Sequence, residues 1–183
     1  MIYELPKVLT VCECEYNIRS DYRAALDICA AFSDPDLDAQ SKAIIALDIM
    51  FPDFAQMPPA HYADALSKCL WFINCGEADN QNTSKVKLMD WEQDFRYIVP
   101  PVNRVLNTEI RDIPYLHWWT FIGAYNEIGD CLFAQIVQIR DKKAKGKKLN
   151  KEEREWYKHN REKVDFKTKY SAAEEELLKK WGT

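Results

Sequence analysis

The block His117-Trp118-Trp119 is the part of the sequence best suited to chemistry, because it places a candidate general base among aromatic rings. On a crowded helix face, however, a histidine is more commonly a packed structural residue. His61 and His159 are not part of a recognisable metal-ligand motif. The sequence also lacks glycine-rich phosphate loops, nucleophile elbows and the His-Glu-x-x-His metal motif. We therefore predict no catalytic residue and a protein that is not an enzyme.

Three carboxylates, Asp90, Glu92 and Asp94, cluster at the start of a predicted helix. Acidic groups in a first turn are stabilised by the helix dipole. This explains the cluster without acid–base chemistry.

The cysteines do not form a recognisable metal motif. Structural zinc sites commonly use Cys-x-x-Cys pairs, whereas the spacings here are Cys12-x-Cys14 and Cys69-x5-Cys75. The chain begins without a secretory pattern, so disulfides are not expected either. We predict free thiols, no metal, no cofactor and a reducing, cytoplasmic setting. The six residues are Cys12, Cys14, Cys29, Cys69, Cys75 and Cys131.

Charge is unevenly distributed along the chain. Residues 1–139 hold 10 basic and 20 acidic residues, whereas residues 140–183 hold 15 basic and 9 acidic. The basic end is either a partner-binding surface or a solvated helical tail whose lysines serve solubility. Nucleic acid is not an expected partner, because the acidic body would repel it and no recognition fold is apparent. The candidate partner-binding residues are Lys142, Lys143, Lys145, Lys147 and Lys148.

Composition indicates one mostly helical domain with a small appendage. The chain has 183 residues, of which 47% are hydrophobic and only 5 are glycine. Few glycines favour a small number of long elements over a many-stranded sheet. No apolar run approaches the roughly 20 residues of a membrane span.

The first half of the chain predicts a hairpin followed by three helices. Two β-rich runs, residues 8–11 and 15–18, flank a short turn. A helix capped by Ser20 follows and ends near Asp34-Pro35. The next helix has Ala43, Ile44, Leu47, Met50 and Phe51 on its inner side. The third starts at Pro58-Pro59, ends at Gly76 and buries Tyr62, Leu66, Cys69, Leu70 and Ile73.

The second half predicts helices from Asp90 and from Asp112, then one carrying Leu132, Phe133, Ile136 and Val137. Pro100-Pro101 predicts a break or strong kink near Val99. Residues 77–87 are expected to form an exposed loop, and residues 141–148 a charged linker.

Two further helices are expected in the basic tail, starting at Asn150 and at Ser171. The predicted fold is thus mainly α, with five or six helices in a bundle, a short N-terminal β-hairpin and a charged C-terminal helical tail. The domain boundary is placed between 1–140 and 141–183. Trp91 and Trp118 are predicted to be core residues.

The order of several sequence blocks resembles a phage family named after gene product fifteen of a siphophage that infects Gram-positive bacteria. The resemblance covers roughly residues 1–140. The matching blocks are Leu5-Pro6, Tyr16-Asn17-Ile18-Arg19-Ser20-Asp21-Tyr22-Arg23, Asp34-Pro35-Asp36-Leu37, Trp71-Phe72-Ile73-Asn74-Cys75-Gly76, Asp90-Trp91-Glu92-Gln93-Asp94 and Tyr115-Leu116-His117-Trp118-Trp119.

This resemblance implies a protein encoded in the phage tail module, close upstream of the tape-measure gene. Tail assembly chaperones, which keep the long apolar tape-measure helices soluble, are commonly encoded there. The resemblance therefore implies binding to the tape-measure protein, with the tail tube protein as a further candidate partner, in the cytoplasm of the infected host. The alternative is a structural tail or connector component retained in the virion. The family implies no catalytic residues, cofactor or membrane association.

Overall fold

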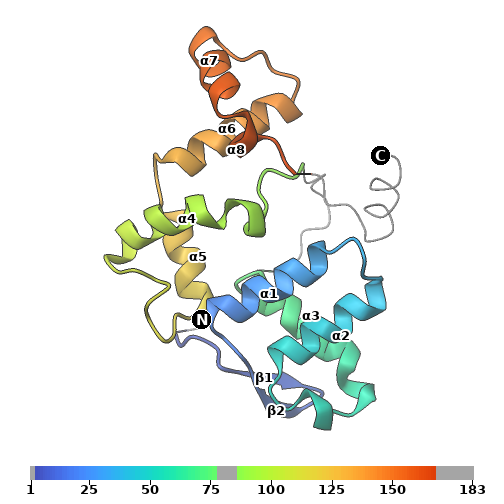
Figure 1. Cartoon of the computed structure of the whole chain (residues 1–183). Helices are drawn as coiled ribbons and strands as arrows, with labels where there is room; N and C mark the ends of the chain where they lie inside the picture. Colours follow the sequence, from blue (N-terminus) through green and yellow to red (C-terminus); the bar gives the residue numbers. More distant parts are fainter. Residues whose placement is uncertain (1–2, 78–85, 168–183) are drawn as a thin grey trace, which may run out of the picture. The chain divides into compact units, whose positions relative to one another are not determined.

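The computed structural model describes residues 3–77 and 86–167, and it is mainly α-helical with one small hairpin (Figure 1). This confirms the predicted fold class. In the described part of the chain, one compact unit comprises residues 3–77 and 115–119, and a second comprises 86–114 and 120–167. Most of the predicted 77–87 loop and the helix predicted at Ser171 lie outside the described residues.

The hairpin joins β1 (Val8–Val11) to antiparallel β2 (Cys14–Asn17). Cys12 and Glu13 form its two-residue turn, and both have positive φ, at 47° and 66°. Two left-handed residues in succession match the right-handed twist of the paired strands. Leu9 and Val11 are buried, and the Cys12 amide donates to the Asp64 carboxylate at 2.8 Å. The hairpin therefore packs on the helical part of its unit.

Three helices complete the first unit: α1 (Tyr22–Ser33), α2 (Ala39–Met50) and α3 (Tyr62–Ile73). Two short 3-10 turns, Phe54–Gln56 and Pro59–His61, precede α3. Helix α2 packs against both α1 and α3. The buried residues on these helices are Tyr22, Ala25, Ile28, Ala46, Leu47, Met50, Ala65, Cys69 and Phe72.

The predicted inner faces are partly wrong. Ile44 and Leu70 were expected to face inward but are 36% and 38% exposed. Ala65 and Phe72 are buried instead of Leu66 and Leu70. The buried side of α3 runs through Ala65, Cys69 and Phe72, so it is rotated about the helix axis relative to the predicted side. The predicted cap is also displaced by one residue, since Asp21, not Ser20, accepts from the Arg23 amide.

The end of α3 has a left-handed stop, but its first left-handed residue is Cys75, one position before the predicted Gly76. Gly76 has φ +85°, and its amide donates to the Trp71 carbonyl at 2.9 Å. Cys75, at φ 55°, donates to the Phe72 carbonyl. These two hydrogen bonds form a Schellman motif that satisfies carbonyls at the helix end.

In the second unit, α4 (Trp91–Leu106) begins at Asp90, whose carboxylate accepts from the Gln93 amide at 3.0 Å. The helix is continuous through Pro100 and Pro101, so a break near Val99 is wrong, whereas the alternative, a strong kink there, stays a prediction. Val99, Pro101 and their neighbours Ile98 and Val102 are buried. Burial of these side chains offsets the two amide donors that the prolines lack.

Helix α5 (Trp118–Asn126) starts six residues after the predicted Asp112. Residues 115–117 are not helical because their backbone bonds to the start of α1. The Leu116 carbonyl accepts from the Tyr22 amide at 2.9 Å, and the Trp118 amide donates to the Ser20 carbonyl at 2.8 Å. Asp21 adds a side-chain bond from the Leu116 amide at 2.9 Å. This long-range pairing replaces the helical bonds that the sequence pattern predicted.

Helix α6 (Leu132–Ala144) continues past residue 140, and α7 (Lys151–His159) and α8 (Arg161–Val164) follow. The predicted linker is therefore shorter, because its first half is helical. Gly146, at φ 64°, ends α6 with a second Schellman motif, in which the Lys147 amide donates to the Lys142 carbonyl. Leu132, the first residue of α6, is 42% exposed. A functional division at residues 140/141 stays a prediction.

The helix predicted at Asn150 is confirmed in its start and in its capping chemistry. Asn150 and Glu153 form a reciprocal capping box. Ile136, Ile139 and Val164 make a small core, and Trp156 and Tyr157 of α7 pack against it. Helices α6, α7 and α8 are thereby joined within the second unit.

Candidate functional site

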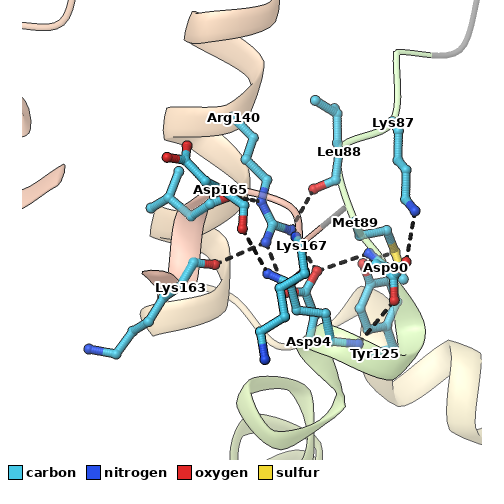
Figure 2. Close-up of polar contacts among 12 residues, drawn as sticks. Lys87, Leu88, Met89, Asp90, Asp94, Tyr125, Arg140, Lys163, Asp165 and Lys167 are labelled. Atoms are coloured by element: carbon cyan, nitrogen blue, oxygen red, sulfur yellow. Dashed lines mark hydrogen bonds and ion pairs between the residues drawn. The ribbon is translucent and has the colours of Figure 1, made fainter. Parts of the chain in front are cut away.

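The most deeply buried polar contact of the second unit joins Asp94 on α4 to Arg140 on α6 (Figure 2). Their side chains are 0% and 4% exposed. Arg140 donates from Nη1 to Asp94 Oδ2 at 2.5 Å and from Nη2 to Oδ1 at 3.0 Å. The pair is therefore bidentate, the geometry in which arginine and a carboxylate bind most strongly.

The remaining donors of Arg140 are also used. Nε donates to the Val164 carbonyl at 2.6 Å, Nη1 to the Leu88 carbonyl at 3.1 Å and Nη2 to the Lys163 carbonyl at 3.0 Å. A guanidinium has five N–H donors, and these contacts with the two to Asp94 occupy all of them. Arg140 thus connects α4, α6, α8 and the segment before α4.

Further contacts surround this pair, which we name the Asp94–Arg140 clamp. Asp94 also accepts from the Asp90 amide at 2.9 Å. The centroid of the Phe166 ring lies 4.1 Å from the guanidinium carbon of Arg140. Gln93 donates to the Asp165 carbonyl and accepts from the Lys167 amide, both at 3.0 Å. These bonds attach the chain after α8 to the first turn of α4.

The clamp is a structural centre, because its polar groups already have partners. A guanidinium with no remaining donor cannot bind a phosphate or a substrate carboxylate without breaking contacts. Sequence reasoning assigned Asp94 only to the helix dipole and did not single out Arg140. A signal was present, since Asp94 lies three residues after Trp91 and four before Ile98, and Arg140 lies four after Ile136. Helical spacing thus places both on buried faces.

His117 is packed inside the first unit and is 3% exposed. Its Nδ1 accepts from the Trp119 amide at 3.1 Å, so its Nε2 carries the proton and donates to the Pro6 carbonyl at 3.0 Å. Burial lowers the pKa of His117, and the nearby Lys7 charge acts in the same direction. Both ring nitrogens are engaged, which fits the expected structural histidine better than a general base.

The two tryptophans beside His117 cap the end of α3. The Trp118 indole donates to the Ile73 carbonyl at 2.9 Å, and the Trp119 indole donates to the Phe72 carbonyl at 2.8 Å. These carbonyls belong to the last turn, where intrahelical donors are missing. Trp118 is 2% exposed and is confirmed as a core residue.

Trp91, by contrast, is only partly buried, so the prediction that it is a core residue is wrong. Its ring centroid lies 6.0 Å from that of Phe121 and 5.3 Å from that of Tyr125. It belongs to an aromatic cluster of the second unit.

The five candidate lysines do not form one free basic surface. Lys142 pairs with Glu153, Lys145 pairs with Asp141 at 2.7 Å, and Lys143 pairs with Asp165. The hydrogen bond from Lys142 lowers the pKa of Glu153. Partial burial lowers the pKa of Lys143, but its bonds to the Asp165 carboxylate and the Tyr157 hydroxyl outweigh this, so its pKa is raised.

Lys147 and Lys148 differ from the other three. Both are exposed, and neither has an ion pair with any residue that the structure describes. These two lysines are the members of the predicted set that are available to a partner.

The described residues contain no group of three or more His, Cys, Asp or Glu side chains that could hold a metal ion. Cys69 is buried, Cys12 and Cys14 are exposed, and Cys29, Cys75 and Cys131 are intermediate. Within residues 3–77 and 86–167, no helix has the length and apolarity to span a membrane.

The aromatic block, the glycine stop at residue 76 and the Asp90 cap are the same features that carry the sequence resemblance, and each has a defined structural role. No match was found among curated proteins or among solved structures. The family model described as "Bacteriophage Gp15 protein" matches residues 1–166, which is most of the chain. The chain therefore belongs to the bacteriophage Gp15 protein family.

Proposed function

We propose that this phage protein is a tail assembly chaperone that binds the tape-measure protein before the tail tube polymerises around it. The observation that carries the proposal is the family match over residues 1–166. This family is associated with the tail module, and the link to the tape-measure protein is an inference by analogy from gene position. The protein then acts in the cytoplasm of the infected host.

The surface chemistry supports a role in protein binding. Side chains such as Leu5, Val105 and Leu132 are 45%, 38% and 42% exposed and offer scattered apolar contacts. Lys147 and Lys148 add exposed positive charge that has no ion pair among the described residues. Exposed basic residues at an interface rim mainly tune the encounter rate and its salt dependence.

The test is co-expression with the tape-measure protein encoded in the same phage genome. We expect the soluble fraction of the tape-measure protein to rise and the two proteins to co-purify. The double variant Lys147→Glu/Lys148→Glu should weaken the complex most at low salt. A control of equal charge change, Lys42→Glu/Arg96→Glu, should weaken it less because both positions lie outside the basic tail.

Deletion of residues 141–183 would be a poor test, because it removes α7 and α8. It would leave Arg140 without the carbonyls of Lys163 and Val164. Loss of binding could then reflect damage to the second unit.

Mass spectrometry of purified phage particles separates the proposal from a structural role. A chaperone should be absent or minor in the particle. A fixed stoichiometry in mature particles, with tape-measure solubility unchanged, would instead identify a structural tail or connector component.

A further inference from the structure

The outer edge of β1 exposes backbone groups that could pair with another strand. In an antiparallel pair, successive residues alternate between bonding to the partner strand and pointing away from it. The Ile18 amide donates to the Lys7 carbonyl at 3.0 Å, so the backbone N–H and C=O groups of residues 7, 9 and 11 point toward β2. The amides and carbonyls of Val8 and Thr10 therefore point away from β2.

These outward groups have no hydrogen-bond partner among the described residues. Val8 is 42% exposed, and Thr10 is also exposed. An open strand edge of this kind is a template for adding a strand.

A groove of about 300 Å³ runs beside this edge and gives the added strand side-chain contacts. It is lined by Pro6, Val8, Leu9 and Thr10 from the strand side and by Ser67, Lys68 and Trp71 from α3. The Trp71 ring packs edge-on against Trp119, with 5.4 Å between centroids. A Cβ on Gly76 would come within 3.2 Å of the Trp119 ring, so the glycine permits this packing. The Trp71 side chain that lines the groove is thus held in place in the absence of a partner.

The charge of the groove indicates what kind of strand fits. Residues 3–77 carry 12 acidic and 5 basic side chains, yet the charged side chain that lines the groove is Lys68. Lys68 has no ion pair with a residue in the described chain. Asp64, one helical turn earlier, is engaged by the Cys12 amide at 2.8 Å. An acidic residue in the incoming strand would complement Lys68.

We propose that the β1 edge binds an extended segment of a partner protein, rich in β-branched residues and with a carboxylate placed at Lys68. Backbone bonds to Val8 and Thr10 supply the pairing, and Trp71 contacts an apolar side chain. This site is separate from the proposed tape-measure interaction and does not depend on it.

The test uses fluorescein-labelled seven-residue peptides of alternating valine and threonine with one aspartate near either end, and anisotropy as the readout. The full-length protein should bind one of them. Thr10→Pro removes an outward donor while leaving the β1–β2 bonds intact, and edge strands tolerate proline. It should weaken binding about tenfold, the effect of one lost hydrogen bond of about 1.4 kcal/mol.

Glu15→Pro is the matched control. Glu15 pairs with Thr10, so its amide points away at the opposite edge of the hairpin. This variant should bind within about twofold of the unchanged protein, which also controls for damage to the hairpin by proline. Lys68→Glu, on α3, should reverse the preference between the aspartate peptide and one with lysine in its place.

Amide hydrogen exchange by NMR gives a second readout. The Val8 and Thr10 amides should exchange fast in the free protein and slowly with peptide, while the Leu9 and Val11 amides are slow in both. Failure of every peptide to bind, or equal weakening by Thr10→Pro and Glu15→Pro, would overturn the proposal. Slowing of Val8 and Thr10 with rising protein concentration and no peptide would also overturn it, because the occupant would then be a second copy.

Discussion

Removing Asp94 should destabilise the second unit strongly, because it leaves Arg140 charged and buried without a carboxylate. Breaking a buried ion pair by removing one partner costs about 3–5 kcal/mol. We expect Asp94→Ala to fall in that range. Arg140→Met should cost more, since it also leaves the carbonyls of Leu88, Lys163 and Val164 without this donor, at about 1 kcal/mol each.

The double variant Asp94→Ala/Arg140→Met distinguishes the charge from the hydrogen bonds. It removes both charges, so it should be more stable than Arg140→Met alone. The unsatisfied carbonyls should still leave it about 3 kcal/mol below the unchanged protein. Asp141→Ala is the control, because it removes an exposed pair with Lys145 whose side chains are 32% and 54% exposed. That pair should contribute no more than about 0.5 kcal/mol.

Urea unfolding followed by circular dichroism measures the free-energy changes. Hydrogen exchange with mass spectrometry then locates them, and protection should fall in residues 86–114 and 120–167. A cost below about 1 kcal/mol for Asp94→Ala would refute the reasoning, since one buried partner would then be dispensable. So would a double variant whose loss equals the sum of the single losses, because that would show no coupling.

Three other results are expected. Trp118→Ala should cost about 3–5 kcal/mol in urea unfolding, and Trp91→Ala clearly less, because only Trp118 is fully buried; equal losses would contradict this. Burial raises the pKa of Cys29 to about 11 and that of Cys69 to about 12, so a thiol reagent at pH 8 should spare both in folded protein. All six thiols should react after unfolding, and a lower total would indicate disulfides or bound metal. Because burial lowers the pKa of His117, the unfolded chain binds its proton first, and stability should decline as pH falls below about 6.5. His117→Gln should flatten that decline between about pH 7 and 5, and an unchanged slope would exclude His117 as its cause.

The sequence determined features that depend on neighbouring residues. The hairpin, the Asp90 and Asn150 caps and the stop at Gly76 each rest on a turn or cap whose hydrogen bonds span only a few positions. Such bonds form from local residue types, so the pattern is enough to place them. The resemblance to the Gp15 family was also visible in sequence blocks alone.

The linker predicted after Arg140 is partly helical, and a local signal for this was present in the sequence. Gly146 is the C-terminal stop of α6, a signal of the same kind as Gly76. The density of lysine suggested an unstructured segment, although lysine is a good helix former.

Tertiary structure decided features whose hydrogen-bond or packing partners are distant in the chain. Helix α5 starts late because the backbone of residues 115–117 bonds to the start of α1, about 95 positions away. Helix α4 continues through Pro100 and Pro101 because the surrounding side chains are buried. The clamp joins Asp94 to a residue 46 positions away. Periodicity could place Asp94 and Arg140 on buried faces, but only folding brings the two faces together, and a buried charge is stable only where its partner arrives.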